Sequence, residues 1–287
     1  MESASIPAPG AAPGNKYVSP PKPEVVKKPK LRGTLEEAGD LAIFAVDALK
    51  SLPGSLRYFS EAIRLNAIIT RRTTILLFLM CCFLGVSVSN FGFYFLRSIG
   101  AADFVGILPG LVTPRQTGPQ MFAYVFAGSV CCGITADLAS ARIQDEVAAL
   151  EAQGVEPMEI LVGTRIIATL MFVPIATAIC MLGNIAGSYF NVVLIVKGNS
   201  SGQFLGTLFS IFPLSGIIWC GLTVFLVTLQ CAIVAAFYGM RRYEGGPAAV
   251  GTAVSRSLAV NIVLLHFVIS LTALAIYGGS LGVPIGD

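Results

Sequence analysis

The sequence predicts an all-α integral membrane protein, with N-terminal interfacial helices, five transmembrane helices and a cytoplasmic helix between the second and third. The 287-residue chain is 55% hydrophobic and only 12% charged, with a mean hydropathy of +0.78. That is too little charge to cover a soluble globule of this size. Five stretches contain the roughly 20 mainly apolar residues that a span needs. They are residues 74–96, 119–139, 160–189, 208–238 and 257–280.

Before the first span, the chain has two regions of different character. Residues 1–33 are rich in Pro, Gly, Ser and Lys, a composition that predicts a disordered tail. No basic segment followed by a short apolar run and a cleavage site is present, so we expect the tail to stay in the cytoplasm.

Residues 34–70 mix charged and apolar side chains, which is typical of interfacial amphipathic helices. Thr34 and Glu37 have the spacing of a capping box that would begin the first helix, and Pro53 followed by Gly54 would interrupt it. A second helical piece would run from Ser55 to about residue 70. The alternative is a pair of helices in a small cytoplasmic subdomain.

Residues 71–287 form the predicted five-span domain, and its arginines indicate the topology. Arginines cluster at one set of gaps between spans, near residues 71–72, 142, 165, 241–242 and 256, and are sparse at the other set. The positive-inside rule therefore predicts a cytoplasmic N-terminus and an outer C-terminus. The third and fourth runs are longer than a span needs, so tilt, a kink at Pro174 or Pro213, or a short surface helix must absorb the excess.

The gap between the second and third spans contains an acidic amphipathic stretch, predicted to be a helix over residues 140–153. Arg142 accompanies the acidic residues Asp145, Glu146 and Glu151, and Arg142 can pair with Glu146 at i, i+4. Apolar residues recur on one stripe at Ile143, Val147 and Leu150. Gly154 and Pro157 supply the stop signal. We interpret this helix as a docking surface. The alternative, a solvated helix that rests on lipid headgroups, is disfavoured by its acidity beside an anionic leaflet.

Two blocks of sequence resemble the MlaE/YrbE permease family, and in particular its actinobacterial YrbE-like branch. The first block contains Ala136-Asp137-Leu138-Ala139, the segment 145–150, Gln153-Gly154-Val155-Glu156-Pro157 and the segment 161–168 around Arg165. The second contains Tyr238-Gly239, Gly245-Gly246-Pro247 and the segment 250–254 around Gly251. The chain departs from the family pattern at Asp137, Ala139, Ala148, Thr164 and Ala249.

The resemblance implies a permease subunit of an ABC transporter that moves lipids across the cell envelope with MCE proteins, in the bacterial inner membrane. It implies four partners: a cytoplasmic ABC ATPase, a second YrbE-like permease, an MCE-protein assembly on the outer side, and a lipid substrate. The second permease would be a paralogue or another copy of this chain, and the departures in the docking segment favour a heterodimer. Helix 140–153 would then be the coupling helix.

Two sets of site residues follow from this resemblance and from the sequence pattern. The residues expected to contact the ATPase are Arg142, Ile143, Asp145, Glu146, Val147, Leu150 and Glu151. The residues expected to act as structural or hinge positions are Asp137, Gly154, Pro157, Arg165, Gly245, Gly246 and Gly251.

We predict no catalytic, metal or cofactor site in this chain. No Gly-Lys-Ser/Thr phosphate loop occurs in the sequence, so ATP and Mg²⁺ would be held by the partner ATPase. The seven cysteines lie in apolar runs, where they behave as small hydrophobic residues. The lysines and arginines are not interleaved with aromatic residues, and we expect no nucleic-acid partner. The competing functions are a non-transporting membrane scaffold and an intramembrane lipid-modifying enzyme, although the spans show only isolated polar residues.

Several residues in the spans leave two interpretations open. Asp137 and Arg165 lie at the ends of neighbouring spans, where they would either form an ion pair or extend separately to water. Gly183 and Gly187 form a step that permits close helix approach. His266, which has no acidic residue or Cys at helical spacing, is interpreted as a hydrogen-bonded structural residue rather than a proton carrier.

Overall fold

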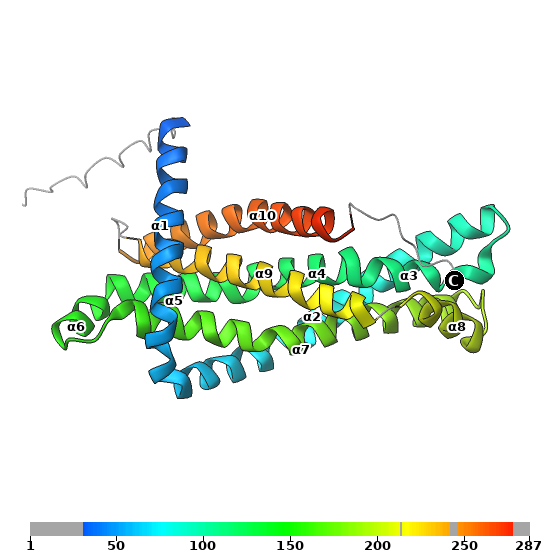
Figure 1. Cartoon of the computed structure of the whole chain (residues 1–287), viewed down its shortest axis with the longest axis horizontal. Helices are drawn as coiled ribbons and strands as arrows, with labels where there is room; N and C mark the ends of the chain where they lie inside the picture. Colours follow the sequence, from blue (N-terminus) through cyan, green and yellow to red (C-terminus); the bar gives the residue numbers. More distant parts are fainter. Residues whose placement is uncertain (1–30, 213, 242–245, 278–287) are drawn as a thin grey trace, which may run out of the picture. The chain divides into compact units, whose positions relative to one another are not determined.

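The computed structural model describes residues 31–212, 214–241 and 246–277. Residues 1–38 and residues 39–287 are separate units, and the described part of the first unit is the start of helix α1 (Leu31–Ser55). The predicted disordered tail, 1–33, lies almost wholly outside the described residues. Figure 1 shows the long helices of the second unit.

The membrane part of the prediction is confirmed, because the described residues contain five helical segments that are long and apolar enough to cross a bilayer. The described residues are almost entirely helical and include no strand. These five segments are Glu36–Ser98, Ala102–Ile143, Met158–Ile195, Ser215–Met240 and Ala248–Ile276.

Helix α1 begins earlier and ends later than predicted. It starts at Leu31, so Thr34 lies inside the helix and cannot be the residue that caps its start. Pro53 is also inside α1, and the chain turns only at the 3-10 segment η1 (Leu56–Tyr58). Pro53 has no N–H to donate to the carbonyl four residues earlier, so α1 lacks one backbone hydrogen bond in its last turn. The side chain of Phe44 packs edge-on against Phe237, with 5.6 Å between ring centroids.

Helix α2 (Phe59–Ser98) is one continuous helix of 40 residues. It joins the predicted second interfacial piece to the first span without a break near residue 70, so these two predicted segments are one element. Whether residues 34–70 lie along a membrane interface stays a prediction.

Helix α2 packs along α7 (Thr164–Tyr189), and glycines bring the two backbones together. A Cβ atom added at Gly183 would lie 2.8 Å from the Cβ atom of Cys81, and one added at Gly187 would overlap the backbone of Cys82. From the other side, a Cβ atom at Gly85 would overlap the backbone of Asn184. The close approach predicted from the step between Gly183 and Gly187 is therefore confirmed.

The second span is built from several helical pieces that follow one another. They are η2 (Ala102–Phe104), α3 (Ile107–Val112), η3 (Thr113–Thr117), α4 (Gly118–Val125), η4 (Phe126–Cys131) and α5 (Cys132–Ile143). The gap predicted over residues 97–118 is thus largely helical. Segments η3 and η4 have the wider π-helical turn, which is often found as a local distortion within α-helices.

The remaining elements complete the bundle. The third span comprises η5 (Met158–Gly163), α7 with Pro174 inside it, and η6 (Phe190–Ile195). A short helix, α8 (Ser201–Ile211), precedes the fourth span α9 (Leu214–Met240), so a separate helix absorbs the start of the long fourth run; Pro213 itself lies outside the described residues. The fifth span is α10 (Pro247–Tyr277).

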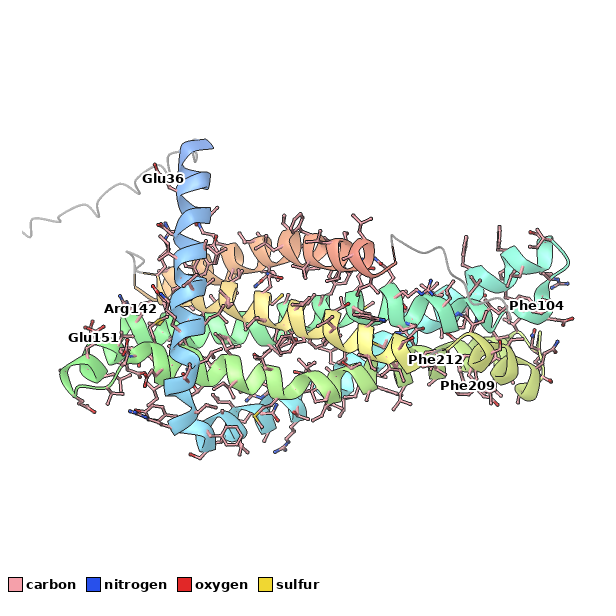
Figure 2. All side chains as sticks on the ribbon, in the orientation of Figure 1. Glu36, Phe104, Arg142, Glu151, Phe209 and Phe212 are labelled. Carbon is pink, nitrogen blue, oxygen red and sulfur yellow. The ribbon has the colours of Figure 1, made fainter. Side chains whose placement is uncertain are left out.

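The two ends of the bundle differ in side-chain character. The short helix α6 (Glu146–Ala152) lies at one end, where Figure 2 shows Arg142 and Glu151. Phe104, Phe209 and Phe212 lie toward the end that carries α8. Between the ends, the core includes the stacked rings of Phe122 and Phe126, with centroids 5.1 Å apart. We refer to these as the α6 end and the α8 end.

Candidate coupling surface and charged pocket

The connection between the second and third spans is not the single helix predicted over residues 140–153. Helix α5 ends at Ile143, and α6 begins at Glu146. Between them Asp145 has a left-handed backbone with φ 59°. Asp is one of the few residues with a side chain that occupies this region at modest cost. The break redirects the chain, so residues on either side of it do not share one helical face.

Helix α6 ends at the predicted place. Gly154 has φ +74°. The N–H of Val155 donates to the carbonyl of Leu150 at 3.0 Å, and the N–H of Gly154 donates to the carbonyl of Glu151 at 3.0 Å. This pair of bonds is the Schellman motif, which glycine favours because it has no Cβ atom to clash in the left-handed region. Pro157 follows and immediately precedes η5, so the predicted stop signal is confirmed.

The break also changes the predicted apolar stripe. Val147 is only 3% exposed, because the chain's own residues bury it. Ile143 and Leu150 are half-buried. Val147 therefore holds α6 against this chain. In the predicted continuous helix it would have filled a groove on a partner, and in the structure it is not available for that role.

The acidic residues of this connection face solvent. Asp145, Glu146 and Glu151 are all exposed, and Arg142 is half-buried. No ion pair within 4 Å joins Arg142 to Glu146, both of which the structure describes. The predicted i, i+4 pairing is absent in this conformation because the break at Asp145 separates the two residues into different helices. The connection thus presents negative charge, which we call the acidic surface, defined as Asp145, Glu146 and Glu151.

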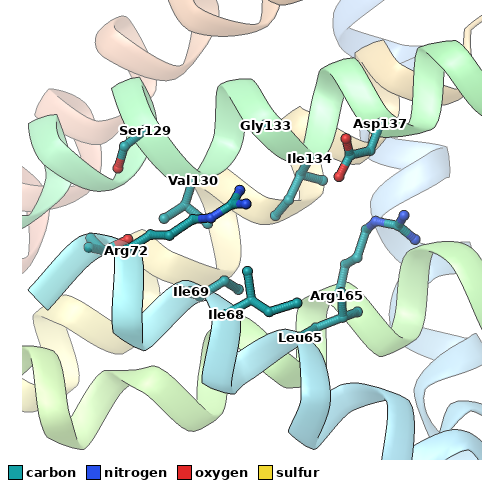
Figure 3. Close-up of a pocket in the computed structure, with 11 residues that line it drawn as sticks. Leu65, Ile68, Ile69, Arg72, Ser129, Val130, Gly133, Ile134, Asp137 and Arg165 are labelled. Atoms are coloured by element: carbon teal, nitrogen blue, oxygen red, sulfur yellow. The ribbon is translucent and has the colours of Figure 1, made fainter.

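A pocket of about 220 Å³ lies between α2, the η4–α5 segment and α7, close to this connection. Its charged residues are Arg72 on α2, Asp137 on α5 and Arg165 on α7. Figure 3 shows Arg72 extending into the middle of the pocket, and Arg165 extending toward Asp137. The pocket brings together residues that are far apart in the sequence.

Asp137 and Arg165 share this pocket but do not form an ion pair within 4 Å, although both are described. The guanidinium of Arg165 donates to the carbonyl of Leu161 at 2.7 Å, one turn earlier in the chain. Asp137 is exposed and Arg165 is half-buried. The expected proximity is therefore observed, and of the two alternatives left open, the direct ion pair is absent in this conformation.

The pocket also contains residues that sequence reasoning used for another purpose or not at all. From the sequence, Arg72 was used only to predict the topology, and no role was predicted for Ser129. A pocket of this kind forms where three helices meet, so no local sequence pattern predicts it.

The predicted hinge glycines near the last span have different environments. Gly246 has φ +65° and immediately precedes α10. Gly251 lies inside α10, where an added Cβ atom would meet nothing within 4 Å, so it is a helical residue and not a hinge between helices. Gly245 lies outside the described residues. Gly239, from the same block of sequence, is the penultimate residue of α9 and packs against Leu138.

Polar residues in the spans are mostly bonded within the chain. His266 contacts the carbonyl of Ile262 through Nδ1 at 2.6 Å and the hydroxyl of Tyr124 through Nε2 at 2.7 Å. The first contact requires a proton on Nδ1, which donates to the carbonyl. This arrangement agrees with the predicted structural role. Asn191 donates to Ser89 at 3.1 Å, which ties η6 to α2.

The fold and site together define a class: an all-α, multi-pass membrane protein whose second and third spans are joined by a short helix with an exposed acidic surface. The family model described as Permease MlaE matches residues 63–275, most of the chain. The chain belongs to this permease family. The match includes the second, third and fourth spanning segments, most of the first and fifth, the acidic surface and the pocket.

Individual relatives agree with this assignment. A "Probable ABC transporter permease protein" of Rickettsia felis is 22% identical over 230 residues, covering 79% of this chain and 89% of the relative. A protein of the same description from Pyropia yezoensis is 22% identical over 186 residues, covering 64% and 70%. The "Intermembrane phospholipid transport system permease protein MlaE" of Haemophilus influenzae is 24% identical over 158 residues, covering 55% and 60%.

Proposed function

We propose that this chain is the permease subunit of an ABC transporter that moves lipids across the cell envelope. Membership of the MlaE permease family carries the proposal. The name of the Haemophilus influenzae relative supports lipid, and specifically phospholipid, as the cargo class. Because the sequence contains no phosphate loop, we assign ATP hydrolysis to a separate subunit.

The acidic surface is the proposed contact with that ATPase. Asp145, Glu146 and Glu151 are exposed, and Val147 anchors α6 to the rest of the chain. A short helix fixed to the bundle and charged on its outer side suits a lever, because movement of the partner would be passed on as a rigid-body shift. The arginine bias supports a cytoplasmic location for this end of the bundle, where ATP is available.

The other proposed partners are a second permease and an MCE-protein assembly. Helix α10 exposes a row of large apolar side chains, among them Val263 at 69%, Phe267 at 63% and Leu274 at 68%. Such a face suits packing against a second YrbE-like permease, which we propose to be a paralogue. The MCE assembly would receive or deliver lipid on the outer side, at the α8 end. The MCE assignment rests on the family resemblance.

Affinity purification from native membranes tests this proposal. The chain carries a C-terminal tag, the membranes are extracted in mild detergent, and co-purifying proteins are quantified by mass spectrometry. We expect a Walker-motif ATPase, a second five-span permease and MCE proteins in fixed ratios. Recovery of the folded chain without an ATPase, even after gentle cross-linking, would contradict the proposal. Recovery of the ATPase with this chain as the sole permease would replace the paralogue with a homodimer.

A further inference from the structure

The pocket between α2, the η4–α5 segment and α7 combines cationic groups with an aliphatic wall. Arg72 and Arg165 supply two guanidiniums and Asp137 one carboxylate, so the charged lining has one net positive charge. Leu65, Ile68 and Ile69 from α2 line one side, and Val130 and Ile134 line the other. A purely structural cavity in a helix bundle does not require two guanidiniums beside five aliphatic side chains.

The chemistry of this lining defines what would bind. Guanidinium groups recognise phosphate through charge-assisted, often bidentate hydrogen bonds. One net positive charge matches the single negative charge of a phosphodiester. A free inorganic anion has no apolar surface to bury against the aliphatic wall. The first carbons of an acyl chain do. The ligand class is therefore an amphiphile with a phosphodiester headgroup.

The size of the pocket agrees with this class. A volume of about 220 Å³ is several times the roughly 30 Å³ that one water molecule occupies. It lies below the roughly 300–1,000 Å³ of pockets that enclose a whole drug-sized ligand. The pocket would thus hold a headgroup and leave the acyl chains outside. Three of its lining residues, Ile68, Arg72 and Gly133, are exposed, so the pocket is accessible from outside the chain.

We propose that this pocket is a binding site for the phosphodiester headgroup of a phospholipid from the cytoplasmic leaflet, held between Arg72 and Arg165. The assignment to that leaflet rests on the proposed topology of the permease. Asp137 belongs to α5, which leads directly into the break at Asp145 and the acidic surface. A lipid bound in the pocket would therefore lie against α5, the helix that leads directly to the proposed ATPase contact.

Two pairs of variants test the site, each with a matched control. Arg72→Gln removes one guanidinium from the pocket, whereas Arg71→Gln removes an exposed neighbour on the same helix that does not line it. Gly133→Leu fills the pocket while keeping both arginines, since an added Cβ atom there meets nothing within 4 Å. Gly128→Leu is its control, because Gly128 is equally open but lies outside the pocket. Thermal unfolding in detergent establishes that each variant is folded.

The measurement is binding of phosphatidylglycerol to the purified, delipidated full chain, followed by native mass spectrometry in detergent micelles. Diacylglycerol and inorganic phosphate serve as the two partial ligands. We expect Arg72→Gln and Gly133→Leu to weaken phosphatidylglycerol binding about tenfold, equivalent to about 1.4 kcal/mol. Arg71→Gln and Gly128→Leu should bind like the wild type, and neither partial ligand should bind as tightly as the phospholipid.

Three results would overturn the proposal. Equal phospholipid binding by all five proteins would place the lipid elsewhere. Inorganic phosphate that binds as tightly as the phospholipid would make the ligand a free anion. Diacylglycerol that binds as tightly would remove the role of the guanidiniums. The assay contains no ATPase, so its result tests the lipid site independently of the proposed transporter assembly.

Discussion

Asp145 determines the direction of the acidic surface, because its left-handed backbone separates α5 from α6. The two helices are linked there by ordinary helical hydrogen bonds on each side, with the N–H of Gln144 donating to Ser140 and that of Ala149 donating to Asp145. The turn is therefore a single-residue feature, and its backbone preference is open to direct test.

Substitution of Asp145 separates its charge from its backbone role. Asp145→Gly should keep the turn and lower the free energy of unfolding little or not at all, because glycine occupies the left-handed region readily. Asp145→Val should cost about 1–2 kcal/mol, since a β-branched residue is strained there. Thermal unfolding of both variants in detergent checks this order. Equal stability of the two variants would show that residue 145 is not left-handed in solution.

Gly187 on α7 is tightly packed, whereas Gly251 on α10 has open space around it. Gly187→Ala places a methyl group against the backbone of Cys82, so α2 and α7 must separate and the midpoint of thermal unfolding should fall. Gly251→Ala meets no neighbour and lies within a helix, so it should be neutral or stabilise the chain by up to about 1 kcal/mol. The same melting assay compares them. A Gly187→Ala protein as stable as Gly251→Ala would contradict the close contact.

Helix α6 acts as one element because Val147 fixes it to the bundle while its charged residues point outward. Its end is equally defined, with two backbone hydrogen bonds closing the Schellman motif at Gly154. The element is thus held at its anchor and at its end, as a lever requires.

The anchor can be tested against an adjacent, exposed position of α6. Val147→Asp buries an unpaired carboxylate, which is strongly unfavourable, so α6 should detach from the bundle. Ala148→Asp adds the same charge at an exposed residue and should leave α6 in place. Limited proteolysis across residues 143–157 should cut Val147→Asp faster than Ala148→Asp or the wild type. Equal cleavage of the two variants would show that Val147 is not an anchor.

The sequence predicts elements well where one strong local signal determines them. Apolar runs of span length located all five spans, and Gly154 with Pro157 located the end of α6. It predicts poorly where competing signals are weak. The periodicity of Ile143, Val147 and Leu150 suggested one helix, whereas the left-handed backbone at Asp145 divides it. Asp is compatible with a helix and with this turn, and the sequence alone does not choose between them.

The same limit applies to the candidate pocket. Asp137 and Arg165 were expected to be neighbours because they end adjacent spans, and the structure places both in one pocket. Arg72 joins them because α2 continues through residues 70–73, where we expected an interfacial helix to end. Its role depends on how three helices cross, which is a property of packing rather than of local sequence.

At the scale of the whole molecule, the five spans and the arginine distribution predict that the two termini lie on opposite sides of the membrane. A fluorescent protein that matures only in the cytoplasm should be bright when fused before residue 1 and dark when fused after residue 287. An alkaline phosphatase that is active only outside should show the reverse. Fusions with both ends on one side would contradict the five-span topology.

In the proposed transporter, the acidic surface is the place where ATP hydrolysis is coupled to lipid movement. The most direct measurement is ATP-dependent transfer of a fluorescent phospholipid by the purified complex in proteoliposomes. We compare the wild type with Glu146→Lys/Glu151→Lys, which reverses two exposed charges of α6 and changes neither Val147 nor any residue that lines the pocket. The account predicts ATP-dependent transfer by the wild type and at least a tenfold loss in the folded double variant. Equal transfer by both proteins, or transfer that does not depend on ATP, would contradict it.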